Sequence, residues 1–136
     1  MYQVEVKVNF RAGHRLLPPY QGKCNNVHGE GYTAICIFEK EELNQNDMLM
    51  DFKCTKEVVK NWVDENWDHA YLHKTNDDVG VFLKEKGMRV FEFDKNPTAE
   101  HMASYLYWVL KINKNLPIKK VGIIESFEDS IAWFEG

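Results

Sequence analysis

The feature that most constrains the fold is a strict alternation of apolar and polar side chains at the start of the chain. From Tyr2 to Phe10, every even-numbered residue is apolar and every odd-numbered residue is polar. Successive side chains of a β-strand point to opposite faces, so this period predicts a strand with one buried face. Pro18-Pro19 and Gly22 then rule out regular structure, and the β-rich segment from Tyr32 to Phe38 follows. We expect the two strands to form an antiparallel hairpin with a long connection.

The hydrophobic period changes after this hairpin. Apolar residues from Val58 to Val63 recur at helical spacing, with Thr55 as the expected N-cap. Asn96-Pro97 is expected to open a second helix, because Asn is a good N-cap and Pro fits the first helical position. Further short strands are expected at residues 89–93, 121–124 and 130–134. The order β-β-α-(β)-α-β-β predicts one α+β domain over residues 1–136, an antiparallel sheet with two helices packed on one face.

Composition excludes several classes of protein. The chain has 136 residues, 44% of them hydrophobic and 28% charged, which is ordinary for a soluble domain with its own core. Its three cysteines lack C-x-x-C spacing, which argues against a disulfide scaffold or a zinc ribbon. A net charge of −4 argues against nucleic-acid binding. Neither an export signal nor a bilayer-spanning stretch is visible, so we expect a cytoplasmic protein with no membrane partner. Open sheet edges favour a homo-oligomer.

Three potential metal ligands lie near the predicted hairpin. His14 ends the alternating strand, and His28 and Glu30 stand two residues apart on the approach to the next strand. Residues i and i+2 of an extended segment share a face, so His28 and Glu30 could hold one ion while His14 reaches it from the neighbouring strand. Two imidazoles and a carboxylate with an open fourth position form a known catalytic zinc arrangement. The alternative is three unrelated polar residues, since such spacings also occur by chance.

Other side chains could supply acid–base chemistry. Cys24 lies in a polar loop beside a lysine, where a nearby cation would favour its thiolate. Asp68 precedes His69 at the end of the first helix, and a carboxylate can orient a neighbouring imidazole. The alternative is an exposed histidine at a helix end. Glu125 ends an apolar strand and is either a solvent-facing residue or an anchor for a planar array of N–H donors.

Taken together, these residues resemble the 6-pyruvoyltetrahydropterin synthase / 6-carboxytetrahydropterin synthase family. Five elements in the family's order carry the resemblance and span nearly the whole chain: Phe10-x-Ala12-x-His14, Cys24-x-x-x-His28-Gly29, Trp67-Asp68-His69-x-x-Leu72, Pro97-Thr98-Ala99-Glu100 and Glu125. The resemblance implies the tunnelling fold (T-fold), in which subunits join their sheets into a barrel and stack as a homohexamer, a dimer of trimers.

The resemblance also implies a zinc-dependent lyase. Cys24 matches the thiol that moves protons on the substrate side chain, and Asp68 and His69 match the pair that works with it. Glu125 matches the carboxylate that holds the pterin ring, and Thr98, otherwise a helix-start residue, is a contributor nearby. In the implied reaction, zinc acidifies the side-chain hydroxyls of 7,8-dihydroneopterin triphosphate and triphosphate leaves. Carbon–carbon cleavage then releases acetaldehyde and yields 6-carboxy-5,6,7,8-tetrahydropterin, a precursor of queuosine and other deazapurines.

Glu30 is the main departure from the family pattern. His14 and His28 match two zinc-ligand histidines, whereas Glu30 stands where the third is expected. A carboxylate is an accepted zinc ligand, but its negative charge should weaken the Lewis acid and admit harder ions. Two other interpretations remain: Glu30 turns away and His73 or His101 helps, or this member does not bind metal tightly.

Two branches of the family compete. The segment Gly22-Lys23-Cys24-Asn25-Asn26 resembles the animal-type pyruvoyl synthases. The three residues between Cys24 and His28, fewer than in those enzymes, resemble the bacterial carboxy synthases. We favour the bacterial branch, because spacing fixes where the thiol lies relative to the metal. A pyruvoyl synthase, a dihydroneopterin-aldolase-like variant and a non-catalytic pterin- or metal-binding relative remain as alternatives.

Overall fold

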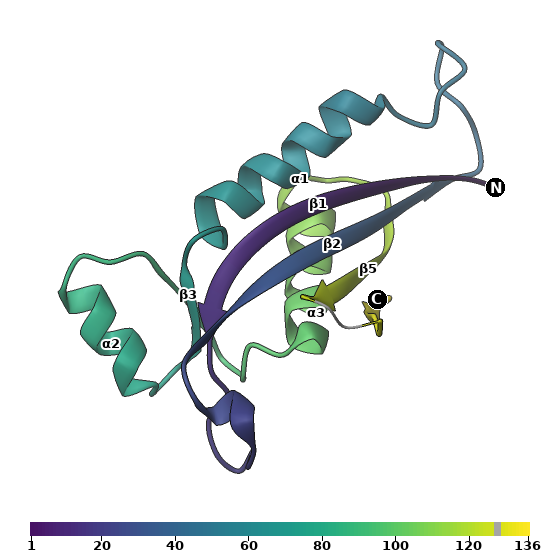
Figure 1. Ribbon diagram of the computed structural model, residues 1–136. Helices are drawn as coiled ribbons and strands as arrows, with labels where there is room; N and C mark the ends of the chain where they lie inside the picture. Colours follow the sequence, from purple (N-terminus) through teal and green to yellow (C-terminus); the bar gives the residue numbers. More distant parts are fainter. Residues whose placement is uncertain (127–128) are drawn as a thin grey trace.

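The computed structural model describes residues 1–126 and 129–136, which form an α+β arrangement around one sheet (Figure 1). The elements in chain order are β1 (Tyr2–His14), the 3₁₀ turn η1 (Lys23–Asn25), β2 (His28–Lys40), α1 (Phe52–Asn66), β3 (Tyr71–Lys74), α2 (Asp78–Glu85), β4 (Val90–Phe93), α3 (Ala99–Trp108), the π-helical turn η2 (Val109–Asn113), β5 (Ile118–Glu125) and β6 (Ala132–Phe134). Within the described residues, no helix is long and apolar enough to cross a membrane.

The predicted hairpin is the centre of the sheet. β1 and β2 pair antiparallel along their full lengths, from Tyr2 opposite Lys40 to His14 opposite His28. β1 ends at His14, as predicted, whereas β2 is longer at both ends than the predicted segment from Tyr32 to Phe38. The alternation is confirmed: the even-numbered residues from Val6 to His14 are buried, while Lys7, Asn9 and Arg11 between them are exposed. The hairpin therefore carries both histidines on the same face as the apolar core.

The sheet is mixed, which corrects the expectation of a purely antiparallel one. Its strand order is β4-β3-β1-β2-β5-β6 (Figure 1). On one side, β1 pairs with β2, β2 with β5 and β5 with β6, all antiparallel as expected. On the other side, β3 pairs parallel with β1, and β4 pairs parallel with β3. Parallel neighbours need a crossover connection, which α1 and α2 supply. Neither β3 nor α2 was predicted from the sequence.

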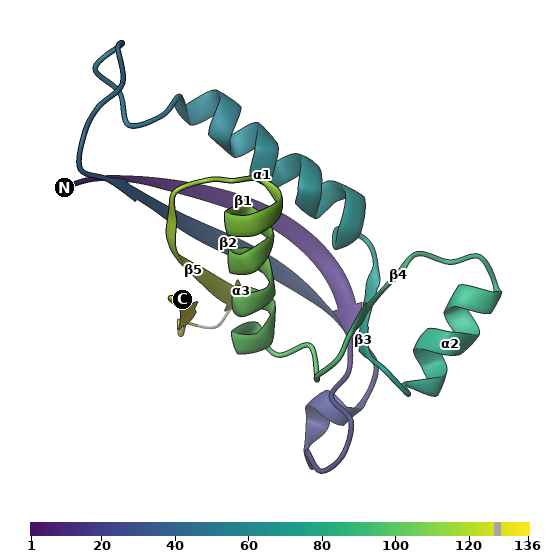
Figure 2. The ribbon, with the colours of Figure 1, turned by 180° about the vertical axis from the view of Figure 1, so that it is seen from behind.

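Two helices cover one face of the sheet, as predicted. Figure 2 shows α1 and α3 in front of the β1–β2 hairpin, and their buried side chains share one core with the strands. The core includes Val59 and Val63 of α1, Met102 and Leu106 of α3, and the adjoining Trp67. The third helix, α2, packs against β3 and β4 at one end of the sheet.

Both predicted N-caps are wrong by a few residues. Asp51, and not Thr55, caps α1, because its Oδ1 accepts the N–H of Cys54 at 2.9 Å. Thr98, and not Asn96, caps α3, and its hydroxyl oxygen accepts the N–H of His101 at 3.2 Å. The Asn96 side chain instead holds the loop after β1. It accepts the N–H of Leu17 at 2.9 Å and donates to that residue's carbonyl at 3.1 Å.

Candidate metal centre and substrate cavity

His14 and His28 face each other where the β1–β2 hairpin opens. They are directly opposite in the register, and their Nε2 atoms lie 3.0 Å apart. His14 is 2% exposed, whereas the His28 side chain is 27% exposed. The hairpin therefore presents one buried and one accessible imidazole to the same point.

Neighbouring groups set the tautomer of both histidines. The Nδ1 of His14 lies 3.0 Å from the carbonyl oxygen of Pro97, and the Nδ1 of His28 lies 2.7 Å from that of Asn26. A carbonyl oxygen can only accept, so each Nδ1 carries the hydrogen and each Nε2 of a neutral ring presents a lone pair. Two lone pairs aimed at one point suit a cation, and backbone acceptors of this kind orient the histidines of metal sites.

Glu30 joins the two histidines from two residues along β2. Its Oε1 lies 3.2 Å from the Nε2 of His28, and one ligand atom from each of the three residues lies within 4.8 Å of the others. Two nitrogen or oxygen ligands on a tetrahedral zinc ion are about 3.3 Å apart, given bond lengths of about 2.0–2.1 Å. The donor set and its spacing therefore fit a divalent metal ion.

Burial keeps the inner ligand in the form that binds a metal. Desolvation lowers the pKa of His14 below its ordinary value, although the hydrogen bond to the Pro97 carbonyl acts in the opposite direction. A neutral imidazole is the metal-binding form, because the ligand nitrogen must be free of a proton. Burial therefore favours the metal-binding form of His14.

The other two histidines considered as ligands lie elsewhere. His73 is buried in β3 against α2, and its Nδ1 bonds the carbonyl of Lys74 at 3.0 Å. His101 lies in the first turn of α3 beside Asp94, with its Nε2 3.1 Å from a carboxylate oxygen of that residue. Among the described residues, neither belongs to the group that could hold a metal.

Cys24, Thr98 and Glu125 share one cavity with His14. The cavity has a volume of about 430 Å³, and its apolar walls include Ile123 and Ile131. Cys24 comes from η1, Thr98 from the start of α3 and Glu125 from the end of β5. β2 and β5 pair so that Glu125 is opposite Tyr32, which places the carboxylate beside the metal ligands on the helix-covered face. Volumes of this size are typical of small-molecule sites.

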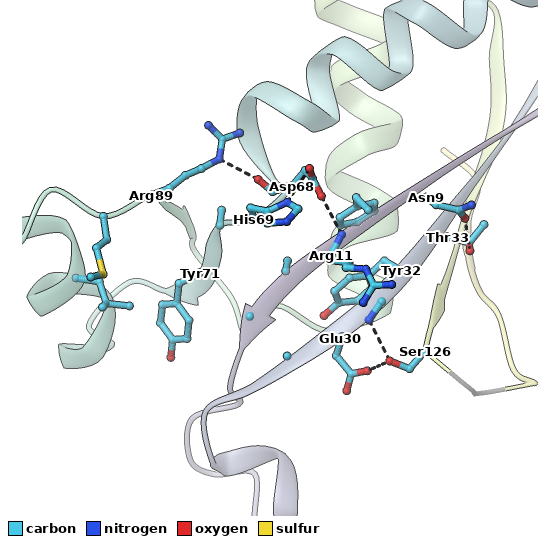
Figure 3. Close-up of a pocket in the computed structure, with 18 residues that line it drawn as sticks. Asn9, Arg11, Glu30, Tyr32, Thr33, Asp68, His69, Tyr71, Arg89 and Ser126 are labelled. Carbon is cyan, nitrogen blue, oxygen red and sulfur yellow. Dashed lines mark hydrogen bonds and ion pairs between the residues drawn. The ribbon is translucent and has the colours of Figure 1, made fainter.

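Asp68 and His69 line a different, open cavity of about 1240 Å³ (Figure 3). Adjacent residues of a regular helix do not face each other. The backbone of His69 is left-handed, with φ 59°, and this break from helical geometry lets the two side chains meet. The Nδ1 of His69 lies 2.9 Å from Oδ2 of Asp68, whose Oδ1 accepts the N–H of Arg11 at 3.0 Å. Burial raises the pKa of Asp68, but the bonds from Arg11 and His69 lower it further than burial raises it. Within one chain, the pair is formed but does not share the cavity of Cys24.

Ser126, which holds Glu30, was not among the predicted site residues. Its hydroxyl donates to Oε2 of Glu30 and accepts the N–H of Gly31 at 3.1 Å (Figure 3). The residue follows β5 directly, in what the sequence shows only as a turn. No local pattern could reveal the contact, since it depends on the pairing of β2 with β5.

Comparison with known proteins agrees with this arrangement. Residues 3–136 match the sequence model of the family described as 6-pyruvoyl tetrahydropterin synthase. A 6-carboxy-5,6,7,8-tetrahydropterin synthase of Rickettsia felis is 33% identical over 102 residues, covering 74% of this chain and 73% of the relative. A protein of the same name from Aquifex aeolicus is 30% identical over 129 residues, covering 81% and 79%.

Solved structures give the same result. The 6-pyruvoyl tetrahydropterin synthase of Caenorhabditis elegans superposes with a TM-score of 0.72 at 26% identity, covering 99% of this chain and 95% of that one. An uncharacterized protein from Wolinella succinogenes superposes with a TM-score of 0.81 at 20% identity, covering 99% and 98%, which supports the fold alone. The chain belongs to the 6-pyruvoyl tetrahydropterin synthase family.

Proposed function

We propose that this protein converts 7,8-dihydroneopterin triphosphate and one water molecule to 6-carboxy-5,6,7,8-tetrahydropterin, triphosphate and acetaldehyde, as a homohexamer in the cytoplasm. The observation that carries the proposal is the meeting of Cys24, Thr98 and Glu125 in one cavity with the metal-binding candidate His14. The Rickettsia felis and Aquifex aeolicus relatives are named for this product.

The cavity offers groups for both parts of the substrate. The Glu125 carboxylate can accept two adjacent N–H groups of a pterin ring edge, a charge-assisted contact that fixes the ring plane. Ile123 and Ile131 supply apolar walls for the ring. With the ring held in this way, Cys24 and His14 are the groups available to the substrate side chain, which is where protons must move.

We assign His14, His28 and Glu30 as the ligands of a zinc ion. Zinc bound there would polarise and acidify hydroxyl groups of the substrate side chain. The chain's own contribution is to hold the two imidazoles by the carbonyls of Pro97 and Asn26, which leaves their Nε2 atoms facing each other, with His14 at the wall of the cavity. Cys24 would act as the acid–base group that moves the side-chain proton.

The Asp68–His69 pair would act on the cavity of a neighbouring copy. The His69 side chain is 75% exposed, so it is available to another chain, while Asp68 orients it at 2.9 Å. A homo-oligomer would bring such an outward-facing pair to a cavity that is incomplete in one copy.

Product analysis tests the proposal. Zinc-loaded protein is incubated with 7,8-dihydroneopterin triphosphate, and the products are identified by mass spectrometry. We expect a 6-carboxy pterin with stoichiometric acetaldehyde, and Glu125→Gln should weaken substrate binding while zinc content stays unchanged. Absence of triphosphate release from the metal-loaded enzyme would overturn the proposal.

A 6-pyruvoyl product is the second candidate. It is favoured by the segment Gly22–Asn26 and by the fold match to the Caenorhabditis elegans enzyme. The same experiment separates the two, because the 6-pyruvoyl pterin retains the carbons that would otherwise leave as acetaldehyde. A hydroxymethyl pterin would instead indicate aldolase-like chemistry.

A further inference from the structure

The two carboxylate oxygens of Glu30 have different neighbours. Oε1 lies 3.2 Å from the Nε2 of His28, on the side of the metal-binding group. Oε2 accepts a hydrogen bond from the hydroxyl of Ser126 (Figure 3). Oε1 is thus directed to the point where the three candidate ligands meet, and Oε2 already has a hydrogen-bond donor.

The direction of the Ser126 hydroxyl is fixed by the backbone of β2. The Ser126 N–H donates to the carbonyl of Gly31, and the Ser126 oxygen accepts the N–H of Gly31 at 3.1 Å. A hydroxyl has a single hydrogen, and with its oxygen already accepting from Gly31, that hydrogen is free for Glu30. The serine is therefore a dedicated donor to Oε2.

The backbone at Ser126 supports a role for its side chain. Its φ is 40°, in the left-handed region that glycine adopts readily and other residues adopt at a cost. Glycine would suit this turn better by conformation alone. Strained residues that persist in a fold cluster at functional sites, where the surroundings hold them in place.

We propose that Ser126 is a positioning residue that restricts Glu30 to coordination through one oxygen and so sets the metal preference of the site. The inference rests on the proposed metal binding by His14, His28 and Glu30. A carboxylate released from Ser126 can turn both oxygens to the ion and raise its coordination number. Zinc favours four ligands, whereas harder ions such as Mn²⁺ accept six, with oxygen donors. Ser126 therefore favours zinc over manganese.

Metal competition on Ser126 variants tests the inference. Zinc and manganese affinities are measured by competition with a chromophoric chelator for the wild type, Ser126→Ala and Ser126→Gly. Loss of an outer partner of a metal ligand costs about 10–100-fold in affinity. We expect zinc affinity to fall at least about tenfold in both variants, and manganese affinity to fall less. The Co²⁺-substituted protein should lose visible absorbance in both, as its geometry moves away from tetrahedral.

Glycine and alanine separate positioning from a purely structural role. Ser126→Gly tolerates the positive φ and should unfold at a higher temperature than Ser126→Ala. If Ser126 served the turn alone, zinc affinity in Ser126→Gly would equal that of the wild type. Equal metal affinities and equal Co²⁺ spectra in the wild type and both variants would overturn the inference.

A second background isolates the contact with Glu30. In Glu30→His there is no carboxylate oxygen for Ser126 to hold, so adding Ser126→Ala should leave zinc affinity and the Co²⁺ spectrum unchanged. An equally large effect in both backgrounds would contradict the inference. Failure of the metal assignment itself gives a different result: the wild type would bind no stoichiometric zinc, and Glu30→Gln would change nothing.

Discussion

Cys24 is the side chain on which the proposed proton transfer depends. It lies in η1 and lines the same cavity as His14, Thr98 and Glu125. We expect Cys24→Ala to lower kcat for triphosphate release by about 100-fold or more, the scale of a lost acid–base group. Zinc content should stay unchanged, because the thiol is outside the metal-binding group. Steady-state kinetics and metal analysis check both statements.

Cys54 provides the matched control for this substitution. It is also a free cysteine, but it is exposed in the first turn of α1. Cys54→Ala should keep the wild-type kcat. Full activity in Cys24→Ala, or an equal loss in both variants, would remove the proposed role of Cys24.

At the scale of single residues, the sequence predicts side chains that a regular strand pattern places. Alternation along β1 predicts that His14 shares the buried face, and i, i+2 spacing predicts that His28 and Glu30 join it. Ser126 could not be predicted, because it reaches Glu30 from 96 positions away, through strand pairing that has no local signal. The oriented tautomer of His14 likewise depends on the distant Pro97 carbonyl.

At the scale of elements, Asp77 attaches α2 to the rest of the molecule. This fully buried carboxylate caps α2 and accepts hydrogen bonds from Arg15 at 2.6 Å and Tyr71 at 2.8 Å. Burial raises its pKa, but the bonds from Arg15 and Tyr71 outweigh burial and lower it. We expect Asp77→Asn to reduce the free energy of unfolding by about 2–3 kcal/mol at pH 7, since charged hydrogen bonds to a buried group are lost.

The pH dependence of this effect follows from the direction of the shift. A folded pKa below the ordinary 3.8 stabilises the fold at higher pH, and the stabilisation is lost as pH falls from 3.8 through the folded pKa. Denaturant unfolding should therefore show the gap between wild type and Asp77→Asn narrowing in acid. Asp78→Asn is the control, because the Asp78 side chain is 92% exposed and its ion pair with Arg15 contributes at most about 1 kcal/mol. A gap that widens in acid would contradict the assignment.

Gly80 lets α2 lie directly against β3. A methyl group added there would come within 2.3 Å of the buried His73 ring. Alanine is favoured over glycine in a helix by about 1 kcal/mol, whereas overpacking a buried contact costs about 1–3 kcal/mol. Because the ring is enclosed, we expect the overpacking cost to dominate and Gly80→Ala to unfold at lower denaturant concentration. Gly29→Ala, whose methyl group meets nothing within 4 Å, should not.

Elements with a long regular pattern could be predicted, and short ones could not. The alternation of β1 and the apolar spacing in α1 are strong enough to identify both. β3 has four residues, and α2 has eight, so neither repeats its period enough to be recognised. The parallel pairing of β3 with β1 and of β4 with β3 depends on crossover connections through α1 and α2. These connections are a property of the assembled fold. The error at Asn96 has a similar origin, because its cap function is replaced by a contact with Leu17.

At the scale of the whole molecule, the proposed catalytic groups are divided between two cavities. Cys24 and Glu125 line one of about 430 Å³, and Asp68 and His69 line another of about 1240 Å³. Among the metal-ligand candidates, His14 lines the first cavity and Glu30 lines the second (Figure 3). In a single copy, neither cavity therefore contains all of the proposed catalytic groups. In the proposed hexamer, a neighbouring copy supplies the group that is missing.

Mixing two inactive variants tests this division. Cys24→Ala and His69→Ala should each lower kcat for triphosphate release by about 100-fold, as expected for acid–base groups. When the two chains are co-expressed and assembled together, about a quarter of the intersubunit sites receive both an intact Cys24 and an intact His69. Activity should then return to about a quarter of the wild-type value, because each such site is complete. If Cys24 and His69 of the same chain worked together, every site would keep one defect, and the mixture would be as inactive as either variant alone.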